Sequence, residues 1–193
     1  MIKRKKLLMA AASLLTVFTL AACGNGEDSQ DNSMENMDHS SSSEDSMEGM
    51  NHSTSGEIPE GLQEADNPTY EVGSKAIISA DHMEGMDGAE ATIVGAYDTT
   101  AYSISYTRTD NGEEVKDHKW IIQEEIEGAG NEPYEPGEEV TVNAEHMEGM
   151  NGAAAVIDSA IDTTVYMVDY TSTTDGEEVT NHKWLTESEL SAE

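Results

Sequence analysis

The fold is decided by a segment that occurs twice, as HMEGMDGAEATIVGAYDTTAYSISY at residues 82–106 and as HMEGMNGAAAVIDSAIDTTVYMVDY at residues 146–170. The copies are offset by 64 residues without a gap. About half of the aligned positions are identical over the longer units, residues 70–127 and 134–191. Internal identity of this kind indicates a duplicated domain whose two copies share one fold.

Apolar side chains in each unit alternate with a period of two, which is typical of half-buried strands and not of helices. The predicted strands of the first unit include residues 76–80, 89–93, 102–106 and 115–121. Turn-forming residues separate them, with a turn expected at Tyr97-Asp98-Thr99 between the second and third strands. Short strands in so small a unit favour an SH3-like β-barrel. We therefore expect an all-β protein with two tandem small barrels, over residues 69–127 and 134–193, joined by a linker at 128–133.

The N-terminus has the pattern of a secretory signal. A basic run at residues 3–6 precedes an apolar run at residues 7–20, which is too short to span as a mature helix. The following Leu20-Ala21-Ala22-Cys23 resembles the bacterial lipobox, and Cys23 is the only cysteine in the chain. The sequence thus predicts cleavage of a signal peptide, residues 1–22, and lipid attachment to Cys23 at the outer face of the cell membrane. An ordinary signal peptide and an uncleaved anchor are the alternatives.

Residues 23–68 are rich in Ser, Asp, Glu, Asn and Gly and poor in branched aliphatic residues. They are predicted to form a disordered tether, because they cannot bury enough apolar surface to offset the entropy of ordering.

The formal net charge is −31, and removal of residues 1–22 takes away four basic and no acidic residues, which leaves a mature chain near −35. A chain of this charge is repelled by phosphate backbones, which disfavours nucleic acid as a partner.

Methionine and histidine recur together in the mature chain. Eight of its nine methionines form four Met-x-x-Met pairs, each beside a histidine: Met34, Met37 and His39; Met47, Met50 and His52; His82, Met83 and Met86; His146, Met147 and Met150. Thioether sulfur is a soft ligand and imidazole a borderline one, so these sets favour Cu(I), or Ag(I), over hard ions. Packing of the methionines in a core is the alternative interpretation.

A second pattern is His118-Lys119-Trp120, repeated as His182-Lys183-Trp184. Strand alternation places each histidine on the same face as the tryptophan two residues later. We expect His118 to approach the His82 turn, and His182 the His146 turn, giving one metal site per repeat. Alternatively, the tryptophan seals the core and the histidine is a hydrogen-bonded neighbour. No nucleophile elbow, phosphate loop or Cys/His pair is present, so an enzyme is not expected.

The motifs His-Met-x-Gly-Met-x-Gly-Ala, Asp-Thr-Thr-x-x-Tyr and His-Lys-Trp, each present twice behind a lipobox, resemble the YdhK family of Gram-positive bacterial lipoproteins. Some members, the CopL-type lipoproteins, are associated with copper resistance, and the resemblance implies the same for this chain. The first unit has Arg108 and Lys116 where the second has Ser172 and Thr180, so the two sites are expected to differ in affinity.

These patterns predict a non-enzymatic, membrane-anchored lipoprotein that binds Cu(I) outside the cell. Its expected role is copper sequestration or resistance, with a copper exporter or a multicopper oxidase as partner. The alternative is a cell-envelope module that binds peptidoglycan or a protein through the faces of Trp120 and Trp184. In that case the methionine pairs would be incidental.

Overall fold

The structure is a computed structural model that describes residues 53–192. This part is all-β, as predicted, with two tandem repeats and only two short 3-10 turns. The elements are β1 (Gln63–Glu64), β2 (Lys75–Ile78), β3 (Glu90–Thr107), β4 (Glu114–Ile122), η1 (Gln123–Glu125), β5 (Glu139–Thr141), β6 (Ala154–Thr171), β7 (Glu178–Thr186), η2 (Glu187–Glu189) and β8 (Leu190–Ser191). Among the described residues, no helix has the length and hydrophobicity needed to cross a membrane.

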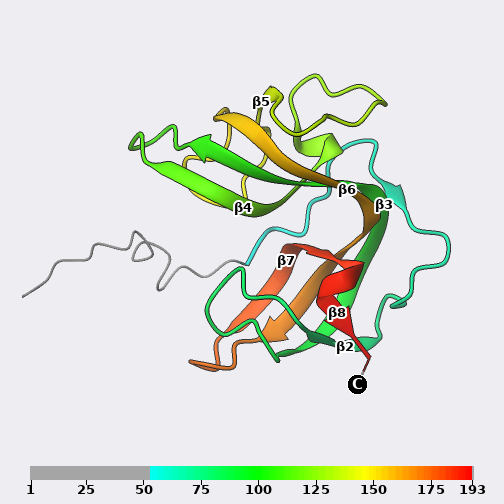
Figure 1. Cartoon of the computed structure of the whole chain (residues 1–193). Coiled ribbons are helices and arrows are strands. Elements are labelled where there is room, and N and C mark those ends of the chain that lie inside the picture. The colour runs from blue at the N-terminus through cyan, green and yellow to red at the C-terminus, as the bar shows by residue number, and fades with distance from the viewer. Residues whose placement is uncertain (1–52, 193) are drawn as a thin grey trace, which may run out of the picture. The chain divides into compact units, whose positions relative to one another are not determined.

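Two long strands, β3 and β6, form the centre of the sheet and lie side by side along most of their length (Figure 1). Their antiparallel register runs from Ala91 opposite Tyr170 to Tyr106 opposite Ala155. The turn predicted at residues 97–99 is therefore wrong. These residues continue β3 because β6 supplies ladder partners there, and the Thr164 hydroxyl also donates to the Asp98 carboxylate at 2.8 Å.

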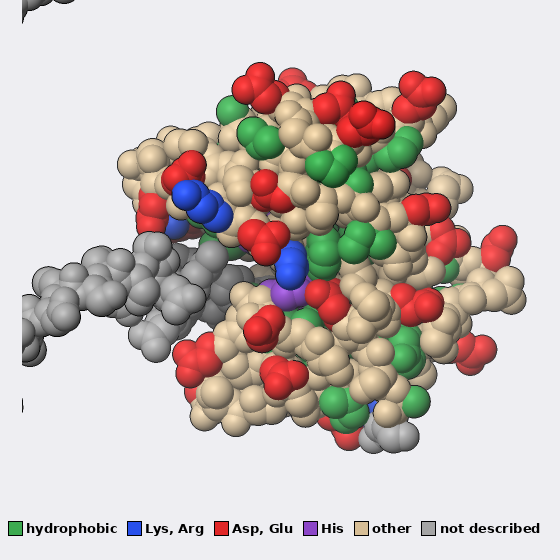
Figure 2. Space-filling model, in the orientation of Figure 1, with side chains coloured by type: hydrophobic (Ala, Val, Ile, Leu, Met, Phe, Trp, Pro, Cys, Tyr) green, Lys and Arg blue, Asp and Glu red, His purple; other side chains and the backbone are tan. Residues whose placement is uncertain are grey.

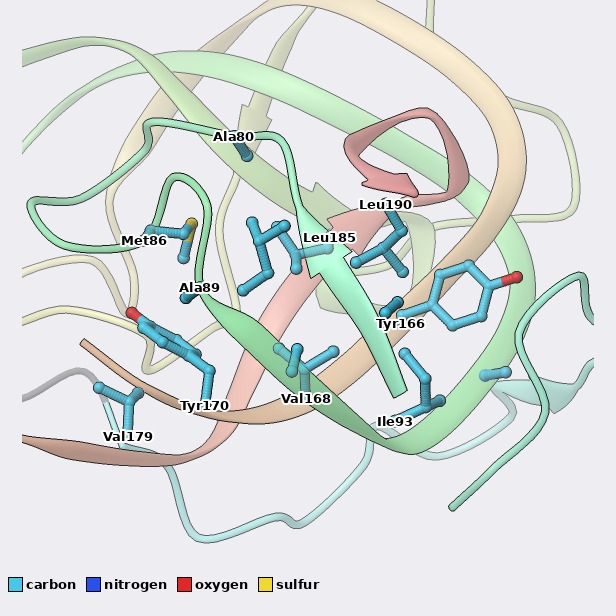
Figure 3. Packing of buried hydrophobic residues seen from close by; sticks show 14 residues of the cluster. Ala80, Met86, Ala89, Ile93, Tyr166, Val168, Tyr170, Val179, Leu185 and Leu190 are labelled. Carbon is cyan, nitrogen blue, oxygen red and sulfur yellow. The ribbon is translucent and has the colours of Figure 1, made fainter. Parts of the chain in front are cut away.

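The hydrophobic cores combine both repeats. One core joins β2 and the first half of β3, from the first repeat, with side chains of β6, β7 and β8 from the second. Figure 3 shows side chains of both repeats in this core, with Met86, Ala89 and Ile93 from the first repeat and Val168, Tyr170 and Leu185 from the second. In the other core the roles of the repeats are exchanged: residues 102–126, from the second half of the first repeat, pack against residues 142–157, from the first half of the second repeat.

The expectation that each repeat closes its own barrel is therefore corrected. Each core takes the first half of one repeat and the second half of the other, because β3 and β6 pass from one core into the next. A third cluster lies where the halves meet and contains Trp120 and Trp184 together with Tyr97 and Val165. Since the described residues form part of a single compact unit, the two repeats are not separate bodies on a linker.

Residues 53–68 differ from the predicted tether. β1 pairs with β3 at Tyr97 and Asp98, and Leu62 is buried in the third cluster. Residues 53–57 are hydrogen-bonded to β7. Their polar composition conceals these contacts, because most of them use backbone groups and small hydroxyls instead of large apolar side chains.

Candidate metal site

A pocket of roughly 270 Å³ lies between the two halves of the described chain. It brings together six of the predicted metal-ligating residues: His82, Met83, His118, His146, Met147 and His182. In Figure 2, acidic side chains are spread over the visible face, whereas histidine and a basic side chain lie side by side near its middle. The sequence predicted these residues individually, and the fold collects them at one place.

Each of the two loop histidines is held by a glutamate from the other repeat. His82 Nε2 lies 2.6 Å from Glu189 Oε1, and Trp120 Nε1 donates to Glu189 Oε2 at 2.8 Å. The backbone N–H and the hydroxyl of Thr186 also donate to Glu189 Oε2, at 2.8 and 2.9 Å. Glu189 therefore fixes both the imidazole and the indole.

The second half repeats this arrangement. His146 Nε2 lies 2.7 Å from Glu125 Oε1, while Trp184 Nε1 donates to Glu125 Oε2 at 3.1 Å. The backbone N–H of Ile122 donates to the same oxygen at 3.2 Å. Glu125 is only 3% exposed, so this carboxylate depends on the three donors for its stabilisation.

These contacts select one tautomer of each of the two loop histidines in its neutral form. An ionised carboxylate only accepts hydrogen bonds, so Nε2 of His82 and of His146 must carry the proton, and neutral imidazole then has its lone pair on Nδ1. Burial opposes ionisation of Glu189, but the hydrogen bonds from His82 and its other donors outweigh burial and lower the pKa of Glu189. Nδ1 of His82 and Nδ1 of His146 are buried and have no hydrogen-bond partner in the described part of the chain. Each is an available nitrogen ligand.

The methionine pairs divide into two kinds. Met83 and Met147 are half-buried and line the pocket, and Met147 Sδ lies 4.0 Å from the Tyr106 hydroxyl. Met86 and Met150 are 0% exposed and belong to the two cores. The prediction of Met86 and Met150 as ligands is therefore wrong, because the tight turn after Met83 or Met147 directs the chain back into the core. For these two residues the packing alternative holds.

His118 and His182 are positioned by irregularities in their strands. Tyr102, Ile104 and Tyr106 of β3 are paired with Ile121, His118 and Val115 of β4, respectively. Two residues along β3 therefore correspond to three residues along β4. An extra residue thus flanks His118 on each side, and β7 repeats the pattern around His182. Bulges of this kind re-aim side chains and are common near functional sites.

The site expected within each repeat is instead shared between repeats. The Gly85 carbonyl accepts a hydrogen bond from the Thr173 N–H at 2.9 Å, so the His82 loop packs on the β6–β7 hairpin. In the same way, the Gly149 carbonyl accepts from the Thr109 N–H of the β3–β4 hairpin at 2.9 Å. The ring of His118 packs edge-on against Tyr106, which also approaches Met147. His118 is therefore associated with the His146 loop, and not with the His82 loop as predicted.

Alanine at Gly85 or Gly149 is expected to displace the Met-His loops. Both glycines have positive φ, and a Cβ would come within 2.2 Å of the Ser172 hydroxyl at Gly85 or of the Asp110 carboxylate at Gly149. The free energy of unfolding should fall by about 1–3 kcal/mol for each variant, measured by urea denaturation. Gly88→Ala is the matched control for positive φ without a clash. Equal losses in Gly88→Ala and Gly85→Ala would show that close packing of this loop is unimportant.

Basic residues are concentrated at the pocket. Lys116, Lys119 and Lys183 line it, out of only five basic residues in the predicted mature chain. The Nζ atoms of Lys119 and Lys183 lie 5.6 Å from the ring centroids of Trp120 and Trp184, and burial lowers the pKa of Lys183. Thr180, the counterpart of Lys116, does not line the pocket, so the two halves of the site differ in charge.

Two residues of the candidate site, Glu125 and Glu189, were not predicted. Acidic residues are so numerous that these two resembled the solvated surface. Their signal was their equivalence in the repeat, each directly before a buried residue, Ile126 or Leu190. Seven predicted residues lie outside the described residues: Cys23, Met34, Met37, His39, Met47, Met50 and His52. Within residues 53–192, no three His, Cys, Asp or Glu side chains form a group that could hold a metal ion.

The sequences of both repeats match the model of a known family. The family model described as a protein of unknown function, DUF1541, matches residues 72–123 and again residues 136–187. The chain belongs to the DUF1541 family. Within this family, the uncharacterized protein YdhK of Bacillus subtilis (strain 168) is 55% identical over 199 residues, covering 98% of this chain and 91% of YdhK. The resemblance to the YdhK family is thereby confirmed.

Solved structures of the DUF1541 family show the same fold. A crystal structure of the B. subtilis ydhK protein has 63% sequence identity and a TM-score of 0.73, and it covers 76% of this chain and 99% of its own. A solution NMR structure of the ydhK C-terminal domain has 63% identity and a TM-score of 0.61, covering 64% of this chain and 93% of its own.

Proposed function

We propose that this DUF1541 protein is a membrane-anchored lipoprotein that binds Cu(I) outside the cell and contributes to copper sequestration or resistance. The observation that carries the proposal is the pair of buried Nδ1 atoms of His82 and His146, which have no hydrogen-bond partner among residues 53–192. Each histidine is next in sequence to a pocket-lining methionine.

The histidine–glutamate pairs have the arrangement of a metal ligand and its outer-sphere support. Histidines that bind metals almost always donate their second ring N–H to a carboxylate, a carbonyl or water, which fixes the tautomer and raises the basicity of the ligating nitrogen. Glu189 does this for His82, and Glu125 does it for His146.

The remaining donors select a soft ion. Met83 and Met147 offer neutral sulfur beside the imidazole nitrogens, and His118 and His182 line the same pocket. Zinc is bound by thiolate, imidazole and carboxylate ligands, whereas the thioether sulfur that accompanies the imidazoles here suits Cu(I). We propose one half-site of His82, Met83 and His182, and a second of His146, Met147 and His118.

Titration of the mature chain with Cu(I) against a chromogenic chelator tests this function. The Cys23→Ser variant, under anaerobic reducing conditions, removes the lipid and the only thiol, so competition must come from methionine and histidine. We expect the protein to withdraw Cu(I) from the chelator, and a hard ion such as Mg²⁺ not to compete. Absence of competition would reject copper binding as the function.

The lipid on Cys23 is expected to set location and not affinity. The Cys23→Ser protein should bind Cu(I) as tightly as the lipidated protein, because the pocket lies wholly within residues 54–183. Cell fractionation should find the variant released from the membrane, with copper tolerance lost. Unchanged membrane retention would show that another segment anchors the chain.

The alternative of a cell-envelope module needs exposed tryptophan faces. Trp120 is 6% exposed and Trp184 is 0% exposed, and both indole N–H groups are occupied by glutamates. Neither ring is therefore available to stack on a sugar or a peptide. The tryptophans instead support the glutamates that hold His82 and His146.

A further inference from the structure

The first described residues, 53–57, lie along the edge of β7. The Thr54 N–H donates to the Thr180 carbonyl at 3.0 Å, and the Thr180 N–H donates to the Ser53 hydroxyl at 2.9 Å. The Thr54 hydroxyl donates to the Asn181 carbonyl at 2.6 Å, and Lys183 Nζ donates to the Glu57 carbonyl. Thr54 also lines the pocket. An extended segment thus adds to the edge of the strand that carries His182.

The pseudo-equivalent edge on β4 has the same design. Lys116, Asp117, His118 and Lys119 correspond to residues 180–183, and both strands have positive φ before the histidine, at Asp117 and at Asn181. No other segment donates a backbone hydrogen bond to Lys116 in the part of the chain that the structure describes. The β4 edge therefore offers the backbone groups that β7 uses to hold residues 53–57.

The sequence contains a second segment of the docked kind. Residues 47–57 read MEGMNHSTSGE, and residues 34–44 read MENMDHSSSSE. The docked Ser-Thr-Ser-Gly-Glu of residues 53–57 thus has its counterpart in Ser-Ser-Ser-Ser-Glu at residues 40–44. We propose that Ser40–Glu44 docks on the β4 edge at residues 116–119, as Ser53–Glu57 docks on β7.

The chain is long enough for both segments to dock at once. Nine residue steps separate Glu44 from Ser53, which spans about 30 Å when extended. Residues of both β4 and β7 line one pocket of roughly 270 Å³, so the two edges are within this reach. Ser43 replaces Gly56, which has positive φ and a Cβ position 3.0 Å from the Asn181 side chain. The β4 docking is therefore weaker than the β7 docking.

Disulfide trapping in the mature Cys23→Ser chain, with a metal chelator present, tests the docking alone. Ser41→Cys with Lys116→Cys probes the β4 edge, and Thr54→Cys with Thr180→Cys is the positive control on β7. Ser29→Cys with Lys116→Cys is the tether control. Its longer linker lowers the effective concentration by about threefold compared with Ser41. Oxidation at high dilution is followed by intact mass and non-reducing gels.

If the segment docks, the cysteines introduced at positions 41 and 116 should form a disulfide within one monomer. This disulfide should form more than about threefold faster than the one between positions 29 and 116, because linker length alone accounts for about a threefold difference in rate. A rate advantage at or below that factor would overturn the proposal. Predominant disulfide-linked dimers would also overturn it, since the occupant would then be the segment of a second copy. A failed copper titration leaves these outcomes unchanged, so the two proposals fail separately.

Discussion

Replacement of Glu125 by alanine is expected to lower the free energy of unfolding by about 3 kcal/mol. The variant leaves the Trp184 indole, the His146 imidazole and the Ile122 N–H buried without their acceptor. For a domain of this size the loss corresponds to roughly 10 °C in Tm. Urea and thermal unfolding of the metal-free protein measure both quantities.

Glu127, two residues after Glu125, provides the control, because its side chain is exposed. Glu127→Ala should change the free energy of unfolding by no more than about 0.5 kcal/mol. Glu189→Ala should fall between the two, since its carboxylate is more exposed than that of Glu125. If Glu125→Ala were as stable as Glu127→Ala, the buried carboxylate would not be holding the imidazole and the indole.

The paired variant Met83→Leu, Met147→Leu is expected to bind Cu(I) at least about tenfold more weakly than the parent. Loss of a direct ligand should cost at least as much as loss of an outer-sphere partner, which typically costs 10–100-fold. Leucine keeps the apolar volume of methionine, so the fold should tolerate the change at a cost below about 1.5 kcal/mol. Competition with a chromogenic chelator measures the affinity.

Met86→Leu with Met150→Leu is the matched control. It removes the same number of sulfur atoms at the other position of each Met-x-x-Met pair, where the side chains are enclosed in the cores. Its Cu(I) affinity should equal that of the parent. Equal losses in the two variants would mean that sulfur count, and not position in the pocket, controls binding.

The sequence contained enough information for the strands and the repeat, but not for the way in which the repeats combine. Alternation at Ile78, Ile93 and Ile104 correctly predicted buried faces. Because the two repeats carry the same pattern, pairing within a repeat and pairing between repeats bury equivalent residues. Period alone therefore could not show that Ile93 lies opposite Val168 of the other repeat and shares a core with it.

The candidate site was predicted by residue type better than by geometry. His82, Met83 and their counterparts were identified because soft donors recur in pairs. Met86 was assigned wrongly because spacing does not reveal which side of a tight turn faces the core. Glu125 was missed because the sequence does not distinguish a buried glutamate from the many exposed ones. Only its hydrogen-bond partners in the structure, Trp184 and His146, identify it.

The bulges explain why the histidine strands deviated from the predicted alternation. A regular strand would set His118 and Trp120 on one face. With an extra residue on each side of His118, the imidazole packs against Tyr106 while Trp120 reaches Glu189 of the other repeat. Because each core combines the first half of one repeat with the second half of the other, the histidines of both repeats line the same pocket.

A crystal of the mature Cys23→Ser chain soaked with Cu(I), with copper located by its anomalous scattering, tests the central claim most directly. The account predicts copper bonded to Nδ1 of His82 with the sulfur of Met83 beside it, and an equivalent ion at His146 and Met147. Copper found only at surface carboxylates, with both Nδ1 atoms still unligated, would contradict it.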